Sequence, residues 1–508
     1  MSGALGVYVS ASVAVKAVGF LRTLAFVHLL AEAPREYNVW TIGLLVFTLA
    51  GTALCLGANQ ALTRYVSVVQ ARGELAVFLR RVAGPLAAVP VVLAVPVWLA
   101  AGEIASWLTS AGSAVTSADV RVVRLAVLNG VLLAMYLQVM GVLYGLRTYR
   151  LASVVELSGT VLFTVVAVVW LATTRRGEDL LWGHLACLAV SVAAGAWLTS
   201  RAARGEGVSP SCLAGVPPAR GSETGLAFSS DQSSGTHNAG ETPAPHVRAS
   251  EFWGLLKFGL PALAGQLAWL GAPFVGYVVV NRRIGGDQAG VFASWMLLAQ
   301  VAYFAANAAW QVVHSHAARQ QEDDAEAAMA RLRTSYKALA LLWLAASVAL
   351  YLAEPLWVHV LPAEYRPGRG LLGGLLMLYA AMTQMAILTM IARLMERPAV
   401  IAWSAAAGGA VSAVLAWWWT PAHGVGVEAA WAGGVGMLFG GSAAAAAWFA
   451  LRRVRVGARI YVVLLSPAIL LAGPWLSTVC LLVLAAVAIF TPAIFSREER
   501  QEIFRFFH

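Results

Sequence analysis

Apolar stretches of roughly 20 residues follow one another along almost the whole chain, and the loops between them are short and carry arginine. A helix of that length crosses a hydrocarbon core about 30 Å thick. Charged residues make up only 12% of the 508 residues and hydrophobic residues 60%, a balance that excludes a soluble globular domain. The sequence therefore predicts an all-α, polytopic membrane protein.

About fourteen transmembrane helices are expected. The last two are the shortest, because the segment that they share holds barely enough residues for two crossings. The expected spans lie at about residues 8–30, 39–66, 82–106, 120–146, 152–172, 180–200, 252–281, 289–316, 335–361, 370–394, 399–420, 427–450, 459–475 and 476–495.

The two halves of the chain repeat one pattern. Six helices return the chain to its starting side, so both copies should have the same orientation, and parallel repeats of this kind place the substrate site at their interface. Four landmarks recur at offsets of 252, 250, 250 and 249 residues: Trp40 and Phe292, Trp107 and Trp357, Arg147 and Arg397, and Trp182 and Trp431.

The predicted organisation is two parallel six-helix lobes, residues 1–200 and 251–458, with a linker and a tail. Residues 201–250 are rich in Gly, Ser, Pro and Thr and hold almost no aliphatic run, which predicts a flexible cytoplasmic linker. Residues 459–508 should form an extra helix pair and a short cytoplasmic amphipathic tail. Ser496 and Glu499 have the spacing of a capping box at the start of that tail.

Basic residues predict the orientation. If the N-terminus is inside, 23 Lys and Arg residues flank the spans on the inner side and 9 on the outer side. Both termini are therefore expected in the cytoplasm, with the protein in the cytoplasmic (inner) membrane. The net charge of +10 follows from this topology and needs no nucleic-acid partner. Lys16 and Arg22 interrupt the first apolar stretch, which predicts a retained helix instead of a signal peptide.

Three cations inside the spans are the candidate substrate-binding residues: Lys16, Arg22 and Arg64. Arg22 lies about fourteen residues, or roughly 21 Å, into the first span. A charge at that depth costs about 2.5–3.5 kcal/mol, so it should face a wet cavity or a partner. No mid-membrane carboxylate is available nearby in sequence, since Glu156 is expected near the inner end of its span and Glu354 and Glu428 near the outer ends of theirs, which favours an anion supplied by the substrate.

Alternative roles remain for these cations. Arg22 could instead bond to neighbouring carbonyls or a carboxylate, and Arg64 could anchor the inner end of its span. The offset positions in the second lobe, Ala268 and Phe274, carry no charge, so the site should be lopsided toward the first lobe. No set of nucleophile, base and orienting group occurs, so no enzyme activity, cofactor or metal site is predicted.

Several segments resemble polysaccharide flippases of the multidrug, oligosaccharidyl-lipid and polysaccharide exporter superfamily. The resemblance covers nearly the whole chain except residues 201–250. Two departures are Asn38, where the family usually has Gly, and Gly276, where it often has Asp. The segments that carry the resemblance are Gly19–Leu30, Pro34–Trp40, Leu56–Val66, Leu256–Pro261, Leu361–Tyr365 and Pro421–Trp431.

The resemblance implies a flippase that moves a polyprenyl-pyrophosphate-linked oligosaccharide from the inner to the outer leaflet by alternating access. Its substrate and the bilayer would be its partners, other polysaccharide-assembly membrane proteins are further candidates, and a monomer should suffice. Three kinds of alternative stay open. They are a peptidoglycan-precursor flippase of the same superfamily, a major-facilitator-type or multidrug small-molecule exporter, and a membrane glycan polymerase or ligase. Short outer loops disfavour the last of these.

Overall fold

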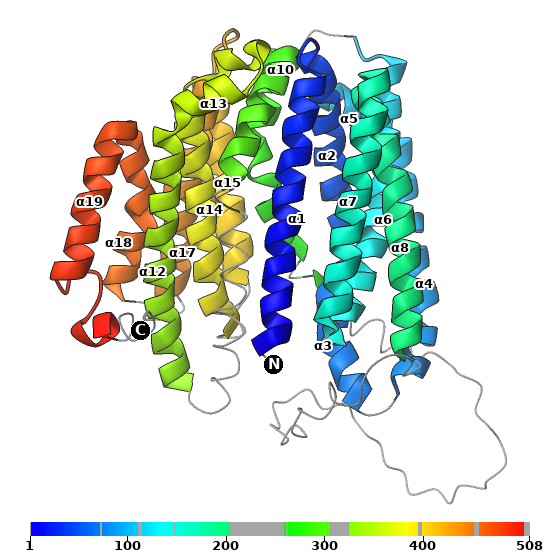
Figure 1. Cartoon of the computed structure of the whole chain (residues 1–508), viewed down its shortest axis with the longest axis horizontal. Helices are drawn as coiled ribbons and strands as arrows, with labels where there is room; N and C mark the ends of the chain where they lie inside the picture. Colours follow the sequence, from blue (N-terminus) through cyan, green and yellow to red (C-terminus); the bar gives the residue numbers. More distant parts are fainter. Residues whose placement is uncertain are drawn as a thin grey trace, which may run out of the picture.

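The computed structural model describes residues 2–71, 74–109, 114–146, 148–203, 259–260, 263–301, 303, 325–394, 399–451 and 457–501. These residues form helices and turns and contain no strand. Figure 1 shows the helices side by side, running between an upper end and a lower end. Seven are long and apolar enough to cross a membrane, or eight with one bent pair. The prediction of an all-α, polytopic membrane fold is confirmed.

The first bundle spans residues 2–203. Helix α6 lies at its centre and contacts α2, α3, α4 and α8, while α1 packs along α7. Helix α5 follows α4 and lies near the upper end (Figure 1). The helices are α1 (Ser2–Leu29), α2 (Pro34–Leu54), α3 (Ala58–Ala71), α4 (Leu75–Leu99), α5 (Ala101–Leu108), α6 (Ser117–Gly145), α7 (Tyr149–Thr174) and α8 (Gly177–Ala203).

The second bundle spans the described residues from 259 to 451. It opens with Leu263–Gly271, which meets α10 at a bend of 51°, and continues through a helix at 286–301. Helix α14 packs against α12 and α16. The other elements are α10 (Phe274–Arg283), α12 (Ala325–Leu352), α13 (Glu354–Val360), η2 (Ala363–Gly368), α14 (Leu371–Leu394), α15 (Ala399–Trp419), α16 (Val427–Val435), η3 (Gly436–Gly441) and α17 (Ser442–Leu451).

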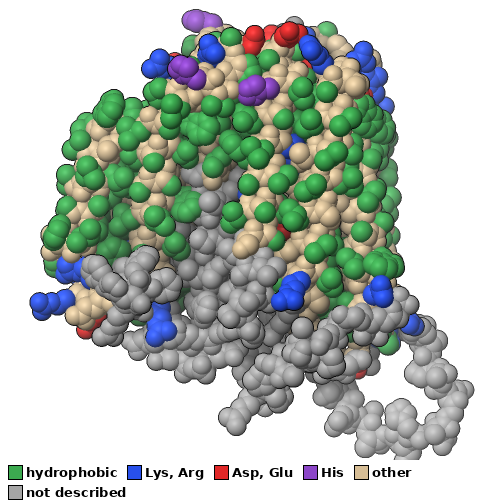
Figure 2. All heavy atoms as spheres, in the orientation of Figure 1, with side chains coloured by type: hydrophobic (Ala, Val, Ile, Leu, Met, Phe, Trp, Pro, Cys, Tyr) green, Lys and Arg blue, Asp and Glu red, His purple; other side chains and the backbone are tan. Residues whose placement is uncertain are grey.

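The C-terminal helices pack on the outside of the second bundle. They are α18 (Ala458–Leu465), η4 (Ser466–Ala472) and α19 (Pro474–Phe490), and they contact α12 and α14. Helix α19 has 17 residues and stays shorter than the long spans, as expected for this pair. Figure 2 shows hydrophobic side chains over the flanks and most charged side chains at the two ends, the distribution that a bilayer selects.

The repeated landmarks occupy equivalent places in the two bundles. Trp107 lies in α5 and Trp357 in α13, the short helices that follow the third span of each bundle. Trp182 and Trp431 lie in the first turns of α8 and α16, whose starts at Gly177 and Val427 are 250 residues apart. Arg147 and Arg397 fall outside the described residues, as does the linker after Ala203.

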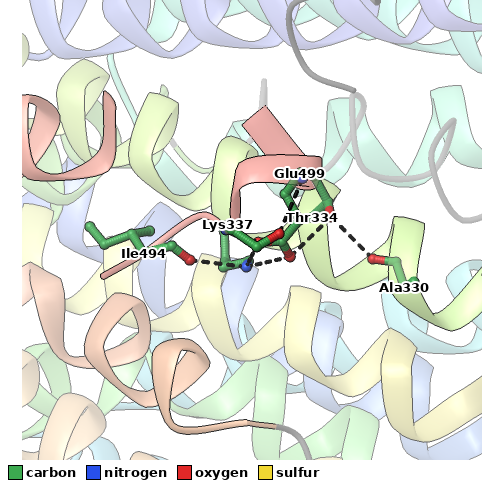
Figure 3. Close-up of polar contacts among 6 residues, drawn as sticks. Ala330, Thr334, Lys337, Ile494 and Glu499 are labelled. Atoms are coloured by element: carbon green, nitrogen blue, oxygen red, sulfur yellow. Dashed lines mark hydrogen bonds and ion pairs between the residues drawn. The ribbon is translucent and has the colours of Figure 1, made fainter. Parts of the chain in front are cut away.

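A buried ion pair fixes the segment after α19 to α12 (Figure 3). The Lys337 side chain is 4% exposed, and its ammonium group donates to both carboxylate oxygens of Glu499 at 2.5 and 2.6 Å and to the Ile494 carbonyl at 3.0 Å. Thr334 donates to the same carboxylate. The expected capping box is present, because the Ser496 backbone N–H donates to Glu499 and the Glu499 N–H to the Ser496 hydroxyl.

This pair depends on the charge of Glu499. Burial raises the pKa of the Glu499 carboxyl, but the hydrogen bonds from Lys337 and from the Ser496 backbone lower it more, so the pKa lies below its ordinary value. A carboxyl with a depressed pKa in the folded state contributes stability above its unfolded pKa and loses it as the pH falls through the folded pKa. The attachment is therefore at full strength at neutral pH.

We predict that Glu499→Gln lowers the free energy of unfolding by about 3 kcal/mol, because it leaves the Lys337 ammonium buried without a counter-charge. The double variant Lys337→Met/Glu499→Gln should lose less than that single variant, since it removes the unpaired charge. Thermal unfolding of the purified protein in detergent measures both. Glu498→Gln, next in sequence but exposed, is the matched control and should change little. Additive losses in the double variant would contradict the pairing.

Candidate functional site

The two bundles meet at the upper end through a reciprocal contact. A Cβ added at Gly290 would overlap the Pro34 carbonyl oxygen, and one added at Gly286 would lie 3.0 Å from the side-chain nitrogen of Asn38. At the repeat offset of 252, Gly286 corresponds to Pro34 and Gly290 to Asn38. Each position therefore touches the counterpart of the other, as two-fold symmetry requires.

Hydrogen bonds between buried side chains reinforce the junction. The Asn38 amide donates to the side-chain oxygen of Asn281 at 3.1 Å, and the Tyr277 hydroxyl donates to the side-chain oxygen of Asn38 at 2.5 Å. The Asn281 amide donates in turn to the Leu108 carbonyl of α5. All three polar side chains are at most 5% exposed. Buried amides without partners are costly, so the pairing favours this arrangement of the bundles.

Tyr365 of η2 extends the junction to α1. Its hydroxyl donates to the Leu30 carbonyl at 3.2 Å, and its ring meets that of Tyr37 edge-on at 6.3 Å. The hydrogen bonds that join two described residues of different bundles all lie at this upper end. The structure is therefore the form in which the bundles are fastened together at the upper end.

A second close approach lies between α2 and α3. Gly57 adopts φ of +70°, and a Cβ there would overlap the Gly259 carbonyl of the second bundle. Only glycine fits both the left-handed backbone and this backbone-to-backbone contact. Because α3 begins after Gly57 and runs to the lower end, this contact lies well below the upper junction.

Arg22 is on the helix that borders both bundles. Helix α1 packs along α7 and also touches the second bundle, where Phe20 meets the Trp357 ring at 6.5 Å (Figure 1). The Arg22 guanidinium lies 4.6 Å from the centre of the Phe163 ring, and its charge acts on Tyr37 and His184. Its buried Nε has no hydrogen-bond partner, and the described residues give Arg22 no ion pair.

An aromatic cluster supports this guanidinium from within the first bundle. The His184 ring stacks on Phe47 at 4.6 Å and meets the edge of Phe163 at 4.8 Å. Its Nδ1 is 2.8 Å from the Asn129 side-chain oxygen, and the Asn129 amide donates to the Leu181 carbonyl. The polar groups of the cluster, the His184 ring and the Asn129 amide, are therefore hydrogen-bonded within it. Arg22 lies seven residues before the end of α1, about 10 Å below the upper end.

Lys16 lies near mid-length of α1, the helix that packs along α7. Helix α7 carries Glu156, the carboxylate expected near the inner end of its span. The packing of α1 on α7 places residues 140 positions apart in the sequence on neighbouring helices.

The side chain of Arg64, the third candidate, lies outside the described residues, although its backbone belongs to α3. Among the residues that the structure does describe, no cluster of His, Cys, Asp and Glu could hold a metal ion. Cys55, Cys187 and Cys480 are free thiols.

The sequence did not predict the contact between the two bundles at the upper end. Asn38 stood out only as a departure from the family pattern, and its buried hydrogen bonds now explain it. Gly276, the other departure, is closely packed, because a Cβ there would lie 3.1 Å from the Ala429 carbonyl oxygen and 3.2 Å from the Phe292 ring. In the sequence, the spacing Gly286-x-x-x-Gly290 is the feature that indicates a close helix contact, since small residues four apart let helices approach closely.

Comparison with solved structures identifies the fold. A multidrug resistance MATE family transporter of the MOP superfamily in an inward-facing conformation matches with a TM-score of 0.59 at 15% identity, over 86% of this chain and 94% of that one. A MATE protein in complex with MaD3S gives 0.58 at 16% identity, over 89% and 95%. An outward-facing MATE family transporter gives 0.56 at 16%, over 89% and 95%. No protein-family model and no curated protein matches the sequence.

We predict that Gly290→Val opens the upper end. The added side chain overlaps the Pro34 backbone, which cannot move aside by rotation, and overpacking of this kind costs about 1–3 kcal/mol. Each 1.4 kcal/mol is about tenfold in an equilibrium. In a chain without its native cysteines, labelling of buried Thr41→Cys by a polar maleimide should rise about tenfold or more. Gly102→Val is the matched control, because nothing lies within 4 Å of a Cβ at Gly102. Unchanged labelling in Gly290→Val would refute the junction.

Proposed function

We propose that the protein is a flippase that moves a polyprenyl-pyrophosphate-linked oligosaccharide from the inner to the outer leaflet by alternating access, for the synthesis of a cell-surface polysaccharide. It would act as a monomer in the cytoplasmic membrane with both termini inside. The upper end is then the external end, and the fastened junction closes the path on that side. The substrate enters from the cytoplasmic leaflet.

The observation that supports this proposal is Arg22. It is a guanidinium on the helix between the bundles, held by stacking on Phe163, with a buried Nε that no described residue satisfies. Arginine binds phosphate oxygens in a bidentate manner, and a pyrophosphate supplies both the charge and the acceptors that Arg22 lacks. The polyprenyl chain stays in lipid. Lys16, and Arg64 toward the lower end, would complete the cationic path.

Lys16 has a different task in this scheme from Arg22. It lies six residues before Arg22 on α1, toward the cytoplasmic leaflet, so it would meet the anionic headgroup first. A series of cations allows a charged headgroup to be passed on without being trapped. The peptidoglycan-precursor flippase of the same superfamily shares this chemistry and differs only in the glycan.

A multidrug exporter is the second candidate, because the similar solved structures are named as multidrug resistance transporters. The same closed junction would serve such an exporter. The two candidates differ in the charge of the cargo: an unpaired arginine disfavours a cationic drug by like-charge repulsion and favours an anionic headgroup.

We predict that Arg22→Ala slows flipping of a polyprenyl-pyrophosphate-linked oligosaccharide at least tenfold, since it removes the charge-assisted hydrogen bonds to the pyrophosphate. Proteoliposomes with the glycolipid in one leaflet measure this through the exposure of the glycan to an added glycosidase. Arg22→Lys should keep part of the rate, because the charge remains.

Arg176→Ala is the control, since Arg176 is exposed at the upper end of the same bundle. Wild-type transport by a normally inserted Arg22→Ala variant would remove the role proposed for Arg22. Export of organic cations by the wild-type protein, without movement of the glycolipid, would favour the multidrug candidate.

A further inference from the structure

An apolar groove of about 550 Å³ runs between the two bundles on one flank of the upper half. Its walls come from α2 and α5 of the first bundle and from α10 and α15 of the second. The volume lies within the range of ligand-binding clefts. Its lining includes Leu45, Leu49, Val275, Val278, Trp107 and Trp417.

The groove spans most of one leaflet. Along α10 it extends from Phe274 to Arg282, eight residues or about 12 Å, against about 15 Å for half of a hydrocarbon core, and Gly271 of the preceding helix lines its lower part. Its upper rim carries Trp107, Trp417 and Trp418, which are 56%, 51% and 79% exposed. Tryptophan gathers at the level of lipid headgroups, so the rim marks the interface and the groove descends into the acyl-chain region.

Arg282 lies at the rim, and its buried Nε donates no hydrogen bond to any described residue. Its guanidinium lies 5.7 Å from the centre of the Trp107 ring. Its neighbour Arg283 is engaged, since it donates to the Trp417 carbonyl and stacks over the Trp417 ring. An arginine at the rim of an apolar groove could bind an anionic phospholipid, with the lipid phosphate on the guanidinium and one acyl chain in the groove below it.

We infer that this groove binds one anionic phospholipid of the leaflet at the upper end, and that the lipid favours the closed junction. Both bundles supply walls of the groove, so the site exists as described only while they are fastened at the upper end. A ligand that binds one state better shifts the population toward it. The lipid would thus set how readily the upper end opens, independently of the cargo that the protein carries.

Native mass spectrometry of the purified full-length chain tests the site, with phosphatidylglycerol as the anionic probe and phosphatidylethanolamine as the zwitterionic one. The wild-type protein should retain one phosphatidylglycerol in preference to phosphatidylethanolamine. Arg282→Gln should weaken this retention about tenfold, the order expected for one lost charge-assisted hydrogen bond. Arg366→Gln, an exposed cation at the same end outside the groove, is the control.

A second variant tests the hydrocarbon part. Gly271→Leu adds a side chain toward Leu49, whose nearest atom would lie 3.9 Å from the new Cβ, so it should fit and shorten the groove. It should reduce retention of phosphatidylglycerol with long acyl chains more than with short ones. In the Thr41→Cys background, phosphatidylglycerol should lower maleimide labelling in the wild type and not in Arg282→Gln.

The proposal fails if Arg282→Gln retains phosphatidylglycerol as the wild type does, or if the two phospholipids bind equally. It also fails if a polyprenyl-pyrophosphate glycolipid displaces phosphatidylglycerol from the wild type but not from Arg282→Gln, which would assign the groove to the tail of a substrate. Loss of glycolipid flipping in Arg22→Ala has no bearing on these outcomes, so the two proposals fail separately.

Discussion

Contact between the bundles at Pro34 and Gly290, and at Gly286 and Asn38, is the constraint on which the rest of the structure depends. It is reciprocal at the repeat offset of 252 residues, so positions that correspond in the predicted repeat meet there. Glycine on one side is essential, because the helix at 286–301 approaches the backbone of α2 too closely for any side chain.

The scaffold repeats, but its chemistry does not. Asn38 carries a hydrogen-bonding amide where its counterpart Gly290 has none, and Lys16 and Arg22 correspond to the uncharged Ala268 and Phe274. The first bundle therefore supplies Asn38 and the two cations of α1, and the second bundle supplies the hydrogen-bonding partners Tyr277 and Asn281.

The sequence predicted what depends on local pattern. The apolar spans and the capping box at Ser496 follow from spacing along the chain, and the structure confirms them. The repeat marked by Trp107 and Trp357 stays a prediction. The hydrogen-bonded pair of Asn38 and Asn281 joins residues 243 positions apart. Such a contact depends on which faces of the helices meet. The helices of this chain are apolar on most faces, so the sequence alone does not determine which faces pack together. The roles of Lys16, Arg22 and Arg64 in binding stay predictions.

The hydrogen bonds of the upper junction are few. Four donor groups join described residues of the two bundles there, and a hydrogen bond between membrane helices contributes on average about 0.6 kcal/mol, or roughly 2.4 kcal/mol in total. Reversing a two-state equilibrium from 1:99 to 99:1 takes about 5.5 kcal/mol. The upper junction is therefore strong enough to favour the closed form and weak enough to be reversed by a ligand that binds the open form better.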